Sequence, residues 1–412
     1  MNRRQRWVTL FSLYAVQGLV LALFSMALKN WLAERGLAPD RLGTFLVIVG
    51  LPTALKIVWG PVVDRWGRSP RGRWSWILAG QAGIAAAGLL AMVVTDPVAQ
   101  LDLLGAILFL QVAATGLFDV AIDGMAVRTS PPEERARTNA VMFSGQAVGI
   151  VVGSVLFSRL LVSSGMPLTA LVQAAMVAAL AAVPLLHWRA AAITPDEADA
   201  SPPASWRAIG RDLRVGLVGR SSVLLAGVFV LTSVGTHALG VMMSYAATSE
   251  WGWASEAYSS TTGALALVKV VGLILGAALA DRIGHVRGFL ICGTLLVAVD
   301  VATGLSVGLL AERSFLIGYL VVNQLLAGMA AVAVLALCMD LCHPRVAATQ
   351  FTAYMALTNL SSLGGDWLGG QLTGTVALGV VFVVYAGAQV VWLGLVASGL
   401  DPEETKRRLE AA

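Results

Sequence analysis

Charged residues are scarce in this sequence: Asp, Glu, Lys and Arg make up 13% of its 412 residues, against roughly 25% in a typical soluble domain. Hydrophobic residues make up 57%, and the mean hydropathy is +0.78. A water-soluble fold cannot bury that much apolar surface. The composition therefore excludes a soluble protein and predicts that the membrane is the solvent for most of the chain.

Cysteine and the common catalytic motifs are also scarce. The three cysteines, Cys292, Cys338 and Cys342, show no zinc spacing and no disulfide framework. The sequence contains no nucleophile elbow, metal-ligand cluster or phosphate-cradling loop. We therefore expect no enzyme activity, no metal and no cofactor, and no transport driven by ATP. An ion gradient or the solute's own gradient is left as the source of energy.

Long apolar runs recur along the whole chain, and each is close to the roughly 20 residues that a helix needs to cross a bilayer. The runs predict an all-α integral membrane protein with twelve transmembrane helices. The predicted spans are residues 8–28, 42–63, 75–95, 101–127, 139–162, 167–187, 220–247, 258–280, 288–310, 315–340, 348–372 and 376–398. The first run is too long for a signal peptide and no small-residue cleavage site follows it, so we interpret it as the first span.

The distribution of basic residues predicts the orientation. With both termini in the cytoplasm, and with Arg159 and Arg220 at the span ends counted with the adjoining loops, 21 of the 28 Lys and Arg fall in cytoplasmic segments, 5 in outside loops, and 2, Lys56 and Lys269, within spans. This positive-inside bias favours a multi-pass protein of the bacterial inner membrane with cytoplasmic termini. It also explains the net charge of +4, so we expect no nucleic-acid partner.

One long polar interruption divides the chain near its midpoint and contains Pro195, Asp196, Pro202 and Pro203. It predicts a cytoplasmic linker at 188–219, between six-helix bundles at 1–187 and 220–400, with a cytoplasmic tail at 401–412. The same type of tetrapeptide, Asp-Arg-x-Gly, follows the second span of each half, at 64–67 and at 281–284. Such an internal repeat is typical of transporters whose halves rock about a central site.

An Asp-Arg-x-Gly-Arg turn between the second and third spans, in a chain of two six-span halves, resembles the signature of the major facilitator superfamily. The resemblance covers essentially the whole chain and implies a monomeric carrier. It implies gating roles for Asp64, Arg65 and Arg68, and the repeat extends these to Asp281 and Arg282. Plain topogenic charge at a helix end is the alternative explanation.

Two further stretches resemble the AmpG-type muropeptide permeases and their relatives. The first begins at Leu51-Pro52 and runs through Lys56 and Trp59-Gly60-Pro61 to Asp64-Arg65; the second is Phe118-Asp119-Val-Ala-Ile-Asp123-Gly124. The resemblance implies transport of cell-wall sugar-peptides, acetyl-coenzyme A or iron-siderophore complexes. AmpG-type members often carry extra C-terminal helices and a Gln-Asp pair where this chain has Phe118-Asp119. The shorter length favours the siderophore permeases.

Ionisable residues within the spans are candidates for function, because a charge at the bilayer centre costs at least about 2.5–3.5 kcal/mol. Asp119 and Asp123 are four apart, so they share one helix face, and two close carboxylates cannot both ionise easily. With Lys56 they form the predicted proton-coupling cluster. A permanent salt bridge from Lys56 to one of the two carboxylates is an equally weighted alternative. No role is assigned to Asp300 or Lys269.

Other polar residues within the spans are candidates for lining a substrate cavity. They are Gln17, Gln146, His237, Asn323, Gln324, Asn359 and Asp366. Hydrogen bonding between helices is the competing role for each of them, and close helix packing is the role expected of Gly145, Gly149 and Gly153.

Together these features predict a secondary transporter that imports a medium-sized solute, of siderophore or muropeptide type, with protons. Two rivals stay open: an efflux carrier for drugs or metabolites, and a membrane receptor that transports nothing.

Overall fold

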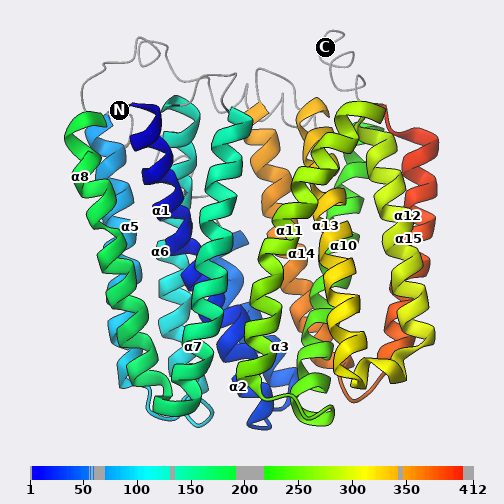
Figure 1. The fold of residues 1–412 in the computed structure, drawn as a ribbon, viewed down its shortest axis with the longest axis horizontal. Coiled ribbons are helices and arrows are strands. Elements are labelled where there is room, and N and C mark those ends of the chain that lie inside the picture. Colours follow the sequence, from blue (N-terminus) through cyan, green and yellow to red (C-terminus); the bar gives the residue numbers. More distant parts are fainter. Residues whose placement is uncertain are drawn as a thin grey trace. The chain divides into compact units, whose positions relative to one another are not determined.

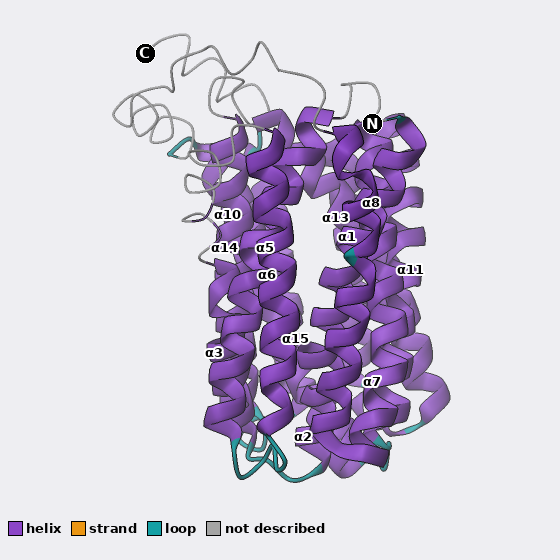
Figure 2. Cartoon of the chain, turned by 90° about the vertical axis from the view of Figure 1, so that its left-hand side faces the viewer, coloured by secondary structure: helices purple, strands orange, loops and turns teal. Residues whose placement is uncertain are grey.

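The computed structural model describes residues 2–54, 56, 59, 70–129, 135–191, 218–341 and 347–401. Every regular element within these ranges is a helix, and within each of the two units described below most of the helices run side by side (Figures 1 and 2). The chain forms two compact units. Unit 1 contains Met1–Ala200 with Ser244–Leu267, and unit 2 contains Ser201–Met243 with Val268–Ala412.

Within its described residues, unit 1 is built mainly from long helices joined by short connections. Its main helices are α1 (Arg3–Leu21), continued by a π-helical segment (Ala22–Leu28) and α2 (Lys29–Glu34), then α3 (Pro39–Ala54), α5 (Pro70–Leu90), α6 (Leu101–Thr129), α7 (Arg135–Leu180) and α8 (Ala182–Ala191). The structure therefore places the predicted spans 8–28, 75–95 and 101–127 on helices. Of the predicted span 42–63, α3 contains residues up to Ala54.

The element α7 contains two of the predicted spans, because the helix breaks in its middle. Gly165 has φ +74° and ψ −174°, a backbone conformation that side chains with a Cβ rarely adopt. Pro167 follows two residues later and has no backbone N–H for the helical ladder. The chain turns back at this point and continues through the end of α7 into α8 (Figure 1), so 139–162 and 167–187 are separate helices.

Glycines bring α1 and the first half of α7 into backbone contact. A Cβ atom on Gly145 would overlap the carbonyl oxygen of Phe11, and one on Gly149 would overlap that of Ala15. From the other side, a Cβ on Gly18 would overlap the carbonyl oxygen of Gln146. The expected packing role of this glycine stripe is confirmed, and it fixes the register between the two helices.

Unit 2 contains most of the remaining helices. They are α10 (Arg220–Tyr245), α11 (Ser255–Ile283), α12 (His285–Leu305), α13 (Arg313–Leu341), α14 (Ala347–Leu372) and α15 (Leu378–Gly399). The end of α10 from Ser244, the π-helical segment Ala246–Glu250 and α11 up to Leu267 belong to unit 1. Its core is apolar, with Phe289, Leu337 and Tyr354 among the buried side chains. Gly365 and Gly369 of α14 lie against the backbone of α10, again too close for a Cβ atom.

Nine helical stretches among the described residues are long and apolar enough to cross a membrane. One of them, Ala140–His187, is 48 residues long and contains the break at Gly165. The prediction of an all-helical membrane protein is confirmed, whereas the number twelve stays a prediction. Most of the predicted linker, nearly all of the tail, Cys342, and the turn with Asp64, Arg65 and Arg68 lie outside the described residues.

Candidate functional site

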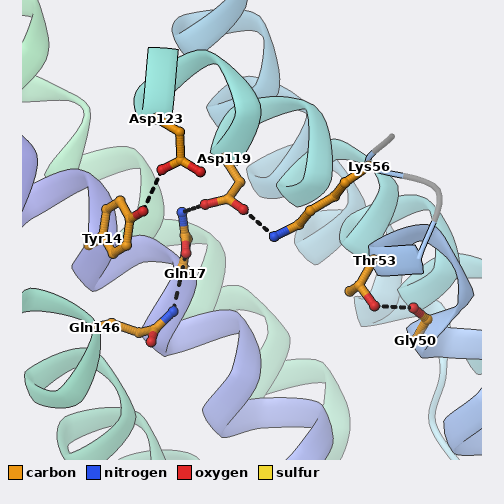
Figure 3. A network of polar contacts seen from close by, with 8 residues as sticks. All are labelled: Tyr14, Gln17, Gly50, Thr53, Lys56, Asp119, Asp123 and Gln146. Carbon is orange, nitrogen blue, oxygen red and sulfur yellow. Dashed lines mark hydrogen bonds and ion pairs between the residues drawn. The ribbon is translucent and has the colours of Figure 1, made fainter. Parts of the chain in front are cut away.

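A polar network lies within unit 1, where three helices and the residue Lys56, two positions beyond α3, meet (Figure 3). Tyr14 and Gln17 come from α1, Asp119 and Asp123 from α6, and Gln146 from α7. The sequence predicts every one of these residues except Tyr14 as part of a functional site. The structure brings the predicted charge cluster and two of the predicted cavity residues together.

Asp119 is the buried centre of this network, with 6% of its surface exposed. One carboxylate oxygen, Oδ2, pairs with the ammonium group of Lys56, and the other, Oδ1, accepts a hydrogen bond from the Gln17 amide. A buried carboxylate needs such compensation, because an isolated charge is costly to remove from water. Asp119 is thus an ion-paired residue with both oxygens engaged.

Asp123 lies one helical turn further along α6 and has a different environment. Its Oδ1 accepts a hydrogen bond of 2.5 Å from the hydroxyl of Tyr14, while the residue as a whole is exposed. No lysine or arginine among the described residues forms an ion pair with it. Asp123 is therefore the carboxylate of the pair whose charge is not matched by an ion partner.

The exposed side of Asp123 does not belong to the outer face of its helix. Exposed apolar residues Leu103, Ala106 and Leu110 mark that outer face at spacings of three and four. At 3.6 residues per turn, Asp123 lies roughly 150° around the helix from this stripe. Its exposed surface therefore lies on the side of α6 that faces Tyr14 and Gln17.

Gln17 connects the charged residues to α7. Its amide nitrogen donates to Asp119, and its oxygen accepts a hydrogen bond of 3.2 Å from Nε2 of Gln146. Gln17 itself is 5% exposed. Because both ends of the Gln17 amide are used, its position depends on α6 and α7 together, and the glycine contacts of α1 with α7 hold it there.

A second pair of ionisable residues lies in unit 2. Nδ1 of His237 on α10 is 3.1 Å from Oδ1 of Asp366 on α14, and their side chains are 43% and 18% exposed. The close contact of Gly365 with the Val234 backbone on α10 sets the register that places them opposite one another. Both residues are predicted cavity candidates, and their partial exposure leaves them accessible.

The remaining predicted residues are distributed differently. The amide of Asn323 on α13 is 3.4 Å from a carboxylate oxygen of Asp300 on α12, so the structure assigns it a contact with another helix. Gln324 and Asn359 are half-buried on α13 and α14. Of the predicted gating residues, Arg282 is exposed in the last turn of α11, and Asp281 precedes it on the same helix.

Tyr14 is the functional candidate that the sequence analysis missed. A tyrosine in an apolar run is normally expected to be a packing residue. The ring of Tyr14 does pack edge-on against Phe143, with 6.2 Å between the ring centroids. The available signal was its spacing of three from Gln17, which places both side chains on one face of α1.

Comparison with known proteins identifies the family. The family model for the Major Facilitator Superfamily matches residues 10–236, more than half of the chain. The chain belongs to the major facilitator superfamily. Anhydromuropeptide permease of Escherichia coli strain K12 is 27% identical over 378 residues, which cover 89% of this chain and 73% of the permease. A putative transporter of Rickettsia conorii, AmpG 4, is 27% identical over 155 residues, 36% of each chain.

Two solved structures of transporters share the fold of this chain. Nucleoside transporter NupG superposes with a TM-score of 0.68 at 12% sequence identity, covering 97% of this chain and 99% of NupG. A POT family transporter in complex with a thioalcohol-conjugated peptide superposes with a TM-score of 0.70 at 14% identity, covering 96% and 94% of the two chains. At these identities the likeness shows the major-facilitator fold and nothing about substrate.

The predicted resemblance to the AmpG-type permeases is thereby confirmed. The chain is an AmpG-like, multi-pass membrane transporter of a small solute, and not an enzyme. The network around Asp119 lies on helices within the matched residues 10–236.

Proposed function

We propose that the protein is a twelve-span, proton-coupled importer of the bacterial inner membrane, that its solute is a cell-wall sugar-peptide of muropeptide type, and that Asp123 is its proton-binding residue. The observation that carries the proposal is the contrast between two carboxylates one turn apart. Asp119 is buried and ion-paired, whereas Asp123 is exposed on the inner side of α6 with a neutral hydrogen-bond donor.

The charges of the network explain why a proton would bind at Asp123. With Lys56 and both carboxylates ionised, the three groups carry a net charge of −1. A proton on Asp123 makes the cluster neutral without breaking the pair between Lys56 and Asp119. A change of one charge unit in a setting of low dielectric is large enough to bias a conformational equilibrium. From the sequence, a salt bridge and a proton site are equally weighted hypotheses for this cluster. In this proposal the salt bridge is at Asp119 and the proton site is at Asp123.

The type of solute is inferred from the curated relatives. The anhydromuropeptide permease matches this chain over 89% of its length, which favours a muropeptide-type solute over a ferri-siderophore. The accessible pair His237–Asp366, with Gln324 and Asn359, supplies polar groups for such a solute in unit 2. Gating by Asp64, Arg65, Arg68, Asp281 and Arg282 remains part of the proposal, as do cytoplasmic termini and a monomer.

Uptake into proteoliposomes tests the proposal. Purified wild-type protein, Asp123→Asn and Asp119→Asn are each offered anhydromuropeptides and a panel of ferri-siderophores, with and without an acidic outside. We expect acid-stimulated uptake of the anhydromuropeptide by the wild type. The uptake rate of Asp123→Asn should be the same with and without the pH gradient, because its neutral amide cannot bind and release a proton.

A matched control distinguishes this effect from a general loss of charge on α6. Asp102→Asn changes an exposed carboxylate in the first turn of the same helix, and it should keep the response of the wild type to the gradient. If Asp123→Asn still responds to the gradient as the wild type does, Asp123 is not the proton site. Accumulation of siderophores alone would overturn the assignment of the solute, and outward proton-exchanging flux would favour the efflux rival.

A further inference from the structure

A second buried carboxylate lies in unit 2. Asp300 on α12 is 2% exposed, and no lysine, arginine or histidine of the described residues forms an ion pair with it. A buried ionised carboxylate without a positive partner costs several kcal/mol. A proton, a bound cation or neutral hydrogen-bond donors must therefore compensate this group.

Three neutral side chains from two other helices surround Asp300. Its Oδ1 is 3.4 Å from the hydroxyl oxygen of Tyr319 and 3.4 Å from the Asn323 amide, both on α13. Its Oδ2 is 3.4 Å from the Gln389 amide on α15. Hydrogen bonds to a carboxylate are normally about 2.7–2.9 Å long. The three groups thus converge on Asp300 without closing to the distance of charge-assisted hydrogen bonds.

With oxygen in place of the two amide nitrogens, a spacing of 3.4 Å matches that of oxygen ligands around a cation. Oxygen atoms about 2.4 Å from a common ion, at right angles to one another, are roughly 3.4 Å apart. The carboxylate and the phenol hydroxyl already present oxygen. Rotation of each amide by half a turn exchanges its NH2 group for its carbonyl oxygen, so Asn323 and Gln389 can present oxygen too.

We propose that Asp300, Tyr319, Asn323 and Gln389 form a binding site for a sodium ion between α12, α13 and α15. A single carboxylate among neutral oxygens balances one positive charge, which favours a monovalent over a divalent ion. The oxygen ligands suit a hard cation and exclude a soft transition metal.

The surrounding packing holds the four groups in place. The ring of Tyr319 stacks edge-on against Phe382 of α15, with 5.6 Å between centroids. One turn beyond Asp300, a Cβ on Gly304 would come within 2.8 Å of the Phe382 Cβ, so α12 and α15 are in close contact there. A site framed by three helices in this way is preorganised and does not need to fold around its ion.

A groove provides a route for the ion. It has a volume of about 680 Å³ and is lined by residues of α12 and α13 and the segment between them. Tyr319 belongs both to the wall of this groove and to the Asp300 site. Glu312, Ser306 and Ser314 supply polar groups in the groove wall, and the negative charge of Glu312 attracts cations.

Thermal unfolding of the purified full-length protein in detergent tests the site. The wild type is compared in sodium chloride and in choline chloride at constant ionic strength and pH, with potassium chloride as a third salt. Sodium should raise the wild-type Tm in a saturable way, by roughly 3–5 °C. Asp300→Asn, which keeps the shape of the side chain, should fold and show no sodium shift. Binding of radioactive sodium should reach one ion per wild-type chain and be lost in Asp300→Asn.

The control variant is Asp366→Asn, which removes the other carboxylate of the unit-2 spans that the sequence analysis singles out. It should keep the sodium shift. Equal Tm values of the wild type in sodium and choline would overturn the proposal, and so would a shift that survives in Asp300→Asn. Stability that responds to pH alone would identify Asp300 as a protonated scaffold residue and equally overturn it. Because both readouts measure binding, they are independent of whether the proposed import is correct.

Discussion

Replacing Lys56 by methionine should expose how strongly the network depends on its ion pair. The change keeps the length of the side chain and removes its charge, which leaves Asp119 buried at 6% exposure with one donor, Gln17. Removing one partner of a buried pair typically costs about 3–5 kcal/mol. The Lys56 side chain is 29% exposed and Gln17 still donates to Asp119, so we expect a loss of stability below that range, about 2–3 kcal/mol.

A double-mutant cycle separates the pair from its surroundings. Lys56→Met with Asp119→Asn removes both charges, so no unpaired charge remains, and most of the lost stability should return. The measurement is denaturant or thermal unfolding of the wild type, the two single variants and the double variant in the same detergent. The reasoning fails if the double variant is no more stable than Lys56→Met, because the cost would then come from lost packing and not from an unpaired carboxylate.

Four further changes have defined outcomes, each measured by unfolding of the purified variant. Gly149→Ala should lower the free energy of unfolding by about 1–3 kcal/mol, because the new Cβ would overlap the Ala15 carbonyl oxygen. Its control is Gly387→Ala on α15, whose Cβ would meet open space and which should leave the free energy of unfolding unchanged or raise it. Gly165→Ala should cost about 1–2 kcal/mol because of its φ of +74° alone, so a neutral result would contradict the proposed turn. Gln146→Leu should cost about 1 kcal/mol through the lost hydrogen bond to Gln17. Asp366→Asn should cost less than about 1 kcal/mol, because the His237 side chain is 43% exposed.

The helices and much of the network could be predicted from the sequence for simple physical reasons. Apolar runs must form helices in a bilayer to satisfy their own backbone groups, so hydropathy locates them. The spacing of four between Asp119 and Asp123 fixes their common face whatever the rest of the fold does. Gln17 and Gln146 are cavity candidates from the sequence, with hydrogen bonding between helices as the competing role. The structure shows that second role, because Gln17 bonds to Asp119 on α6 and Gln146 bonds to Gln17 on α1.

The pairings could not be predicted, because they depend on the register between helices. The sequence left open which carboxylate Lys56 contacts. Lys56 pairs with Asp119 because of its position along the axis of α6, which only the structure gives. His237 and Asp366 are 129 residues apart, so no local spacing connects them. Asn323 was expected at a substrate cavity, yet it lies beside Asp300 because its position four residues after Tyr319 puts both on one face of α13.

The glycine contacts between α1 and α7 also limit which parts of unit 1 can move. Two helices whose backbones touch have no side chains between them to repack, so neither can rotate or slide without a clash. Tyr14, Gln17 and Gln146 therefore move together as one rigid group. A displacement of α6 relative to this rigid group has to break both of the hydrogen bonds that join them, from Gln17 to Asp119 and from Tyr14 to Asp123, so both contacts oppose it.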